Sequence, residues 1–217
     1  MAKPRIFLSS TCYDLNDARA ALTTFLEGYN FEVLNSQLPG FGVTPGRGTA
    51  DACLDQVEIA DYLVLIVGTR SGSVQKGTNQ TITNAEYNRA TEKGIPIIPF
   101  VKKEILHALR IYEKNPAGDF SNEVDNPRVF DFINVIRSGK KDPNWLHEFD
   151  NVNDIIATLR AQFAEYLRLF SVYLGRMPDG RFGPQKTAVA LNGYPAEMEV
   201  LGTTPRLLRI PNPEEGA

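Results

Sequence analysis

Four short apolar runs, separated by helical patterns, constrain the fold more than any other feature of the sequence. The runs span residues 5–8, 31–34, 62–67 and 95–101, and the helical patterns between them span 14–28, 50–60 and 84–93. The run YLVLIV at 62–67 is continuously apolar, which is typical of a central strand covered on both faces. Strands that alternate with helices predict βαβ units with right-handed crossovers. We therefore expect an α/β fold with a flavodoxin-like parallel sheet in the order 2-1-3-4.

The remainder of the chain adds helices and then a separate β pattern. Helical spacing is found over 103–114, 126–138 and 152–174, and a short fifth strand is predicted over 145–149. Asn192 and Gly193 lie between two β-like runs, 187–191 and 197–201, which is a strong hairpin signal, and a third β-like run covers 206–210. Pro195 is expected to leave an unpaired N–H side near the turn. We expect an α/β domain over 1–175 and a tail with a β appendage over 176–217.

Composition narrows the classes of partner. The net charge of −3 offers no general attraction to nucleic acid or to anionic lipid. The two cysteines and two histidines are far apart in the chain, so we expect no metal site. There is no leader-like segment and no apolar stretch long enough to cross a bilayer, which leads us to expect a cytoplasmic protein.

Hydroxyl groups follow the first apolar run directly. Ser9, Ser10 and Thr11 come between that run and the helical pattern that begins near Asp14. Because a helix N-terminus attracts anions, the three hydroxyl residues are expected to bind the phosphate of a nucleotide, and Asp14 is expected to belong to the same nucleotide site. The alternative is that Thr11 and Asp14 only form a capping box for the first helix.

Glu86 is the leading candidate for a catalytic residue. Thr83 is expected to open the helix that carries it, and the two residues have the spacing of a capping box, which is the alternative role. The functional interpretation is a carboxylate that opposes the oxocarbenium charge of a sugar during cleavage of a glycosidic bond. A position near a helix N-terminus should keep this carboxylate ionised.

Further candidate binding residues follow the third strand. Gly68, Arg70, Ser71 and Gly72 occupy the loop there, and a guanidinium at this place can pair with phosphate. Thr83 and Tyr87 are the last candidate binding residues, and Tyr87 can stack on a base or simply pack beside the helix. The Gly- and Pro-rich stretch 39–48 is a candidate lid.

Three motifs give the chain a resemblance to a known family. IFLSSTCYDLNDAR, ADYLVLIVGTRSGS and TITNAEYNRATEKGIPIIPFV are similar, in order and spacing, to a family described as a domain of unknown function, over about residues 4–172. That family looks related to TIR domains and nucleoside deoxyribosyltransferases, and it often accompanies NTPase modules in signalling and bacterial immune proteins. The resemblance implies a TIR-like fold in which the glutamate of ITNAEY, Glu86, is presented to a substrate sugar. Cys12 and Ser71 depart from its usual aromatic and tyrosine residues.

The resemblance implies a TIR-like enzyme that cleaves the N-glycosidic bond of NAD or a related nucleotide, in bacterial antiphage defence. NAD would be substrate or ligand, with no separate cofactor, and the partners would be further copies of the chain or a protein of a multi-component system. The first alternative is a non-catalytic module that senses a nucleotide or oligomerises. The second is a deoxyribosyltransferase-like enzyme, although the sequence lacks a recognisable set of base-binding acids.

Overall fold

The computed structural model describes most of the chain. The described residues are 3–10, 15–36, 41, 46, 48–75, 77–78, 80–139, 145–175, 186–191, 194–201 and 204–209, with side chains up to residue 171. Thr11, Asp14 and most of the predicted lid, 39–48, lie outside them. Contacts divide the chain into two units, Met1–Gly139 with Pro143–Ile156, and Lys140–Asp142 with Ala157–Ala217.

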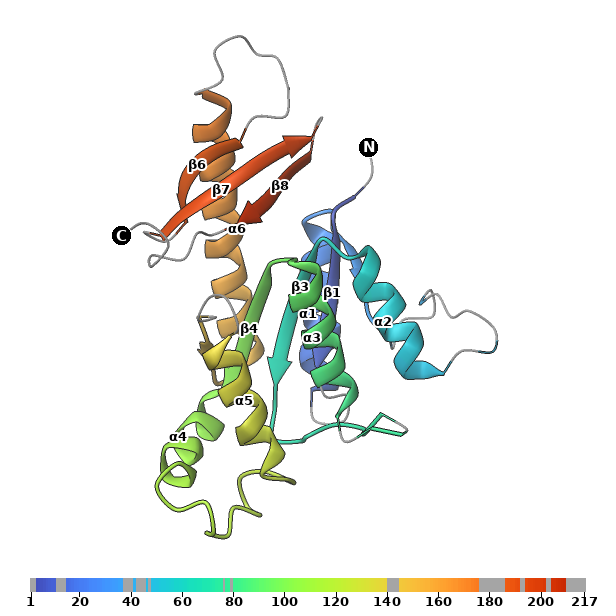
Figure 1. The fold of residues 1–217 in the computed structure, drawn as a ribbon, viewed down its shortest axis with the longest axis vertical. Coiled ribbons are helices and arrows are strands. Elements are labelled where there is room, and N and C mark those ends of the chain that lie inside the picture. The colour runs from blue at the N-terminus through green and yellow to red at the C-terminus, as the bar shows by residue number, and fades with distance from the viewer. Residues whose placement is uncertain are drawn as a thin grey trace. The chain divides into compact units, whose positions relative to one another are not determined.

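A five-stranded parallel sheet forms the centre of the first unit (Figure 1). Its strands are β1 (Arg5–Ser10), β2 (Glu32–Leu34), β3 (Tyr62–Val67), β4 (Ile97–Lys102) and β5 (His147–Phe149). They are arranged in the order β2-β1-β3-β4-β5, and each neighbouring pair is parallel. This confirms the predicted flavodoxin-like α/β fold, including its fifth strand.

β1 is longer than the sequence predicts. Ser9 and Ser10, expected in the loop after the strand, are its last two residues and pair in register with Leu65 and Ile66 of β3. The reason is that β3 offers a full-length edge, and a hydroxyl side chain does not interrupt the backbone hydrogen bonds of a ladder. These serines therefore belong to the ladder with β3 and are not part of an open loop.

Six helices are found among the described residues. They are α1 (Asn16–Gly28), α2 (Thr49–Ile59), α3 (Ile82–Lys93), α4 (Lys103–Tyr112), α5 (Arg128–Ser138) and α6 (Val152–Gly175). α1 begins two residues later than predicted, with Leu15 at its N-cap. Its buried side chains include the polar residues Arg19 and Thr23, whereas Ala18 and Phe25 are half-buried.

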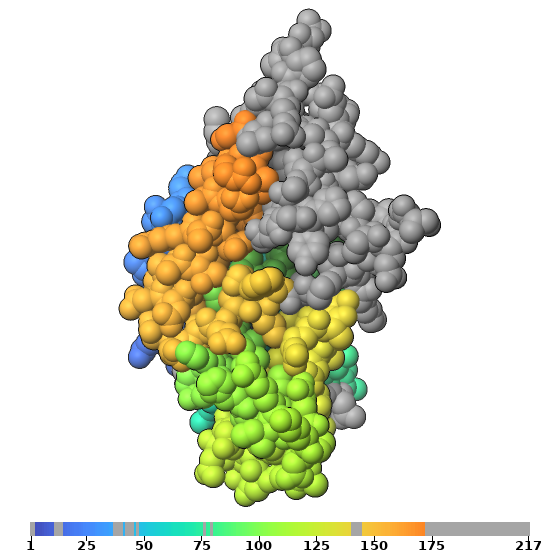
Figure 2. Space-filling view, turned by 90° about the vertical axis from the view of Figure 1, so that its left-hand side faces the viewer, coloured from blue at the N-terminus to red at the C-terminus, as the bar shows by residue number. Residues whose placement is uncertain are grey.

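The core of the first unit is built from strand residues and aromatic rings. Leu63, Leu65 and Val101 of β3 and β4 are fully buried, as is Phe130 of α5. Phe130 also stacks on Tyr112 of α4, with ring centroids 4.7 Å apart. α4 and the segment that follows it therefore pack against α5, and Figure 2 shows their surfaces, lime green and yellow, as continuous.

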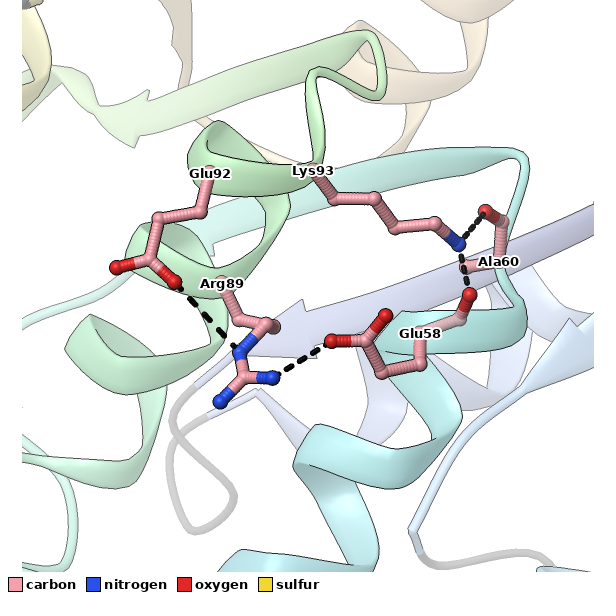
Figure 3. Close-up of polar contacts among 5 residues, drawn as sticks. All are labelled: Glu58, Ala60, Arg89, Glu92 and Lys93. Carbon is pink, nitrogen blue, oxygen red and sulfur yellow. Dashed lines mark hydrogen bonds and ion pairs between the residues drawn. The ribbon is translucent and has the colours of Figure 1, made fainter.

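Polar contacts join the C-terminal ends of α2 and α3 (Figure 3). Arg89 of α3 lies 2.6 Å from a carboxylate oxygen of Glu58, and Lys93 donates to the backbone carbonyl oxygens of Glu58 and Ala60. A lysine at the end of a helix satisfies carbonyls that have no partner within the helix. The contacts hold α3 beside α2, and both helices contribute to the polar cluster described below.

The second unit contains an antiparallel sheet of β6 (Lys186–Leu191), β7 (Tyr194–Leu201) and β8 (Thr204–Arg209). Leu191 pairs with Tyr194, which confirms the predicted hairpin, although Asn192 and Gly193 themselves lie outside the described residues. β7 begins before Pro195, which is opposite Ala190 in the register. The second strand is thus longer than the predicted 197–201.

Among the described residues, the helices are not long and apolar enough to cross a bilayer.

Two glycines at helix ends should respond differently to replacement by alanine. Gly94 ends α3 with a φ of 71°, in the left-handed region, whereas Gly28 is the last residue of α1, and a Cβ would meet nothing within 4 Å at either position. We expect Gly94→Ala to lower the free energy of unfolding by about 1 kcal/mol, because an alanine is strained in that region. Gly28→Ala should be neutral or stabilising. Urea unfolding of both variants checks this, and equal effects would contradict it.

Candidate functional site

A buried hydrogen bond joins α3 to the end of β1. Ser9 Oγ donates to Glu86 Oε2 at 2.5 Å, and the two residues are 1% and 5% exposed. Ser9 pairs with Leu65 of β3, so the contact is made where β1 and β3 lie side by side near their carboxyl ends. The structure therefore brings together the predicted catalytic residue and one of the predicted binding serines.

Glu86 is not a helix cap. The N-cap of α3 is Thr81, whose Oγ1 accepts from the backbone N–H of Asn84 at 3.2 Å. Thr81 also forms a bridge with Val74, and this N-cap lies two residues before the predicted Thr83. Glu86 is consequently more than one turn into the helix, where its side chain reaches Ser9 and not the helix terminus.

Burial raises the pKa of the Glu86 carboxyl to about 7. The hydrogen bonds from Ser9 and Cys53 and the positive charge of Arg19 lower it, but by less than desolvation raises it. The expectation of a fully ionised carboxylate was therefore wrong. It relied on the helix N-terminus, whose effect fades within the first turn, and the sequence gives no direct measure of desolvation.

Arg19 forms the other half of this cluster. Its side chain is 2% exposed, and Nη1 donates to Ser10 Oγ at 2.6 Å while Nη2 donates to Asn35 Oδ1. Asn35 Nδ2 also donates to Thr23 Oγ1 at 3.5 Å. Ser10 is thus engaged by a buried guanidinium that links α1 to β1 and to the residue after β2.

Sequence reasoning missed Arg19, Asn35 and Cys53 as members of the site. Arg19 could have been found, because it follows Leu15 by four residues and precedes Leu22 by three, which puts a charge on the apolar face of α1. Arg19 is also the arginine of the opening motif. Asn35 and Cys53 have no comparable signal in the sequence.

Other predicted binding residues lie at a second place. A pocket of about 220 Å³ is lined by Ile66, Val67, Arg70, Ser71, Thr81, Thr83, Asn84, Arg128, Val129, Asp131, Phe132 and Val135. Ser9 and Glu86 are not among the lining residues. The structure therefore separates Ser9, Ser10 and Glu86, which belong to the polar cluster, from Arg70, Ser71 and Thr83, which line the pocket.

Three other predicted binding residues, Gly68, Gly72 and Tyr87, have surroundings that indicate a structural role. Gly68 is buried directly after β3, and Gly72 has a φ of 81°. Tyr87 is 3% exposed and meets Phe132 edge-on, with centroids 5.7 Å apart, so it packs in the core and offers no stacking surface. Within the described residues, no three histidine, cysteine, aspartate or glutamate side chains are grouped so as to hold a metal ion.

The fold and the buried carboxyl define an α/β protein of flavodoxin-like topology with a polar cluster at the carboxyl ends of its central strands. The chain belongs to the family described as Domain of unknown function (DUF4062), whose model matches residues 5–164. A solved structure titled as that of a probable GTP-binding protein engB is similar at 17% identity and a TM-score of 0.31, over 63% of this chain and 100% of its own. No curated protein matches.

The raised pKa of Glu86 predicts a pH-dependent stability. Between the ordinary pKa of 4.5 and about 7 the folded state binds more protons than the unfolded state, so the stability owed to this group is lost as pH rises through 7. The interval corresponds to roughly 3 kcal/mol at most. We therefore expect the free energy of unfolding of Glu86→Gln, relative to that of the natural protein, to increase from pH 5 to pH 8 in urea unfolding.

The matched control is Glu92→Gln, the same change on the same helix at a side chain that is 73% exposed. Its effect should be small at both pH values. A Glu86→Gln effect that does not vary with pH would contradict the raised pKa.

Arg19 provides a test of the other half of the cluster. Replacing it with methionine leaves Ser10 and Asn35 without their buried donor and Glu86 without its nearby positive charge. We expect a loss of about 3 kcal/mol in the free energy of unfolding. Arg110→Met, at an exposed position of α4, should change it little. Equal effects in urea unfolding would show that the buried guanidinium is not a structural link.

Proposed function

We propose that this protein is a TIR-like nucleotide N-glycosidase that cleaves NAD or a related nucleotide, with the Glu86 carboxylate beside the reacting sugar. The observation that carries the proposal is the hydrogen bond from Ser9 to Glu86. Ser9 lies on β1 beside β3, and the strand order reverses between these two strands in a sheet ordered β2-β1-β3-β4-β5. Ligands of open α/β sheets bind at this switch point, outside the carboxyl ends of the strands.

The chemistry suits a single carboxylate. In NAD the bond between C1′ of the ribose and the pyridinium nitrogen breaks, and its electron pair leaves with neutral nicotinamide, so no general acid is needed. The ionised carboxylate stabilises the oxocarbenium charge at C1′, and water adds its oxygen there while its proton passes to a base. With a pKa of about 7, Glu86 is ionised in a large fraction of molecules at neutral pH and can accept that proton.

Access to Glu86 connects the proposal to assembly. At 5% exposure the carboxyl can meet a sugar only if the groups around it open. TIR-type enzymes, which the motifs resemble, often act only when assembled, and the proposed setting is bacterial antiphage defence. A monomer is accordingly expected to turn over slowly, and assembly with further copies or a partner protein would raise the rate.

A non-catalytic module is the second candidate, and the burial of Glu86 favours it. In that case the bonds of Ser9 and Arg19 only stabilise the fold, and the protein senses a nucleotide or oligomerises. The two candidates differ in one result. A structural glutamate predicts a change in stability with no nicotinamide release, whereas a catalytic one predicts release that depends on the carboxylate.

Incubation with NAD, followed by chromatographic measurement of nicotinamide, tests the proposal. The natural protein should release nicotinamide at a rate that rises about tenfold per pH unit below 7 and levels off above it, because the ionised carboxylate acts. Glu86→Gln should reduce the rate by about 10²-fold, and Glu92→Gln should leave it unchanged. Equal release from the three proteins, or none from the natural protein at any concentration, would contradict the N-glycosidase assignment.

A further inference from the structure

We propose that the pocket between α3 and α5 is a binding site for a sugar phosphate, separate from the polar cluster around Glu86. The pocket of about 220 Å³ lies at the end of β3 and is lined by residues of both helices. Figure 1 shows that α3 and α5 begin at the same end of the sheet at which β3 finishes. None of the arguments below depends on Glu86, so the site stands apart from the proposed glycosidase function.

Positive groups converge on the pocket from two directions. Arg70 follows β3, Arg128 is the first residue of α5, and both line it. Both side chains are exposed, and no ion pair of either is found within the described part of the chain. Guanidinium groups pair bidentately with phosphate oxygens, and two of them suit a dianion.

The start of α3 adds uncharged donors. Thr81 caps this helix, and Thr83 lies in its first turn. Both threonines line the pocket and are largely buried. Ser71, which is half-buried, also lines it. The Thr81 hydroxyl already donates to Asn84 Oδ1, and the backbone N–H groups of Ile82 and Asn84 also have partners. The hydroxyl groups of Thr83 and Ser71 are therefore the donors that can complement a phosphate held by arginines. The site thus combines a cavity, two guanidinium groups and two hydroxyl groups.

The rest of the lining favours a sugar over a bare ion. Asp131 lies one turn after Arg128 and brings a carboxylate, which would repel a second phosphate but can accept a hydrogen bond from a hydroxyl. Val67, Val129 and Phe132 supply apolar wall. The volume is below the range of about 300–1,000 Å³ that is common for drug-sized ligands, which favours a small phosphate ester over a complete dinucleotide.

Titration calorimetry with ribose 5-phosphate tests this site. The natural protein should bind it, and Arg70→Gln and Arg128→Gln should each weaken binding about tenfold, because each removes one charge-assisted contact. Asp131→Asn should weaken binding of ribose 5-phosphate but not that of inorganic phosphate. Ribose without phosphate should not bind measurably.

Two controls separate this site from its surroundings. Arg110→Gln removes an exposed arginine of α4 outside the pocket, and Glu86→Gln alters the polar cluster; neither should change the affinity. No binding by the natural protein would overturn the proposal, as would equal weakening by Arg110→Gln. Loss of binding in Glu86→Gln would place the ligand at the cluster, and equal affinity for inorganic phosphate would remove the sugar from the assignment.

Discussion

The hydrogen bond between the Ser9 hydroxyl and the Glu86 carboxyl is the interaction on which the arrangement of the first unit depends. It crosses from the central sheet to α3 at a place where both partners are almost fully excluded from solvent. Cys53 of α2 and Arg19 of α1 also interact with the same carboxyl. A buried polar group that lacks partners is costly, so three helices and one strand are held in a single relative arrangement around it.

Burial makes ionisation of the Glu86 carboxyl costly and also lets this group exchange a proton near neutral pH. It is expensive for the fold to keep it ionised, and for that reason its pKa lies close to neutral pH, where it can exchange a proton. Perturbed carboxyls of this kind occur at active sites and also in structural networks. The position at the reversal of strand order, rather than the perturbation alone, is what favours an active site here.

The sequence was sufficient for the sheet but not for the site, and the reason is physical. Apolar runs determine which segments become strands, so the strand order and the limits of β3 could be predicted from residues 62–67 and their neighbours. Serines within a strand look like a strand end, and Ser9 and Ser10 were misplaced for that reason.

Side-chain partners across the fold were beyond the sequence. The choice of Thr81 over Thr83 as the cap depends on a bridge to Val74, and the burial of Glu86 depends on α2 packing beside α3. The division of the predicted residues between two places has the same origin. Positions near one another along α3 face different neighbours, so Glu86 reaches β1 whereas Thr83 lines a pocket shared with α5.

The guanidinium of Arg19 has an implication for how chains of this family can diverge. It donates to both Ser10 on the sheet and Asn35 after β2. Substitution of any one of the three residues therefore leaves the others buried without their hydrogen-bond partner. Positions 10, 19 and 35 should consequently change together in evolution, and a homologue that lacks the arginine should have apolar residues at all three positions.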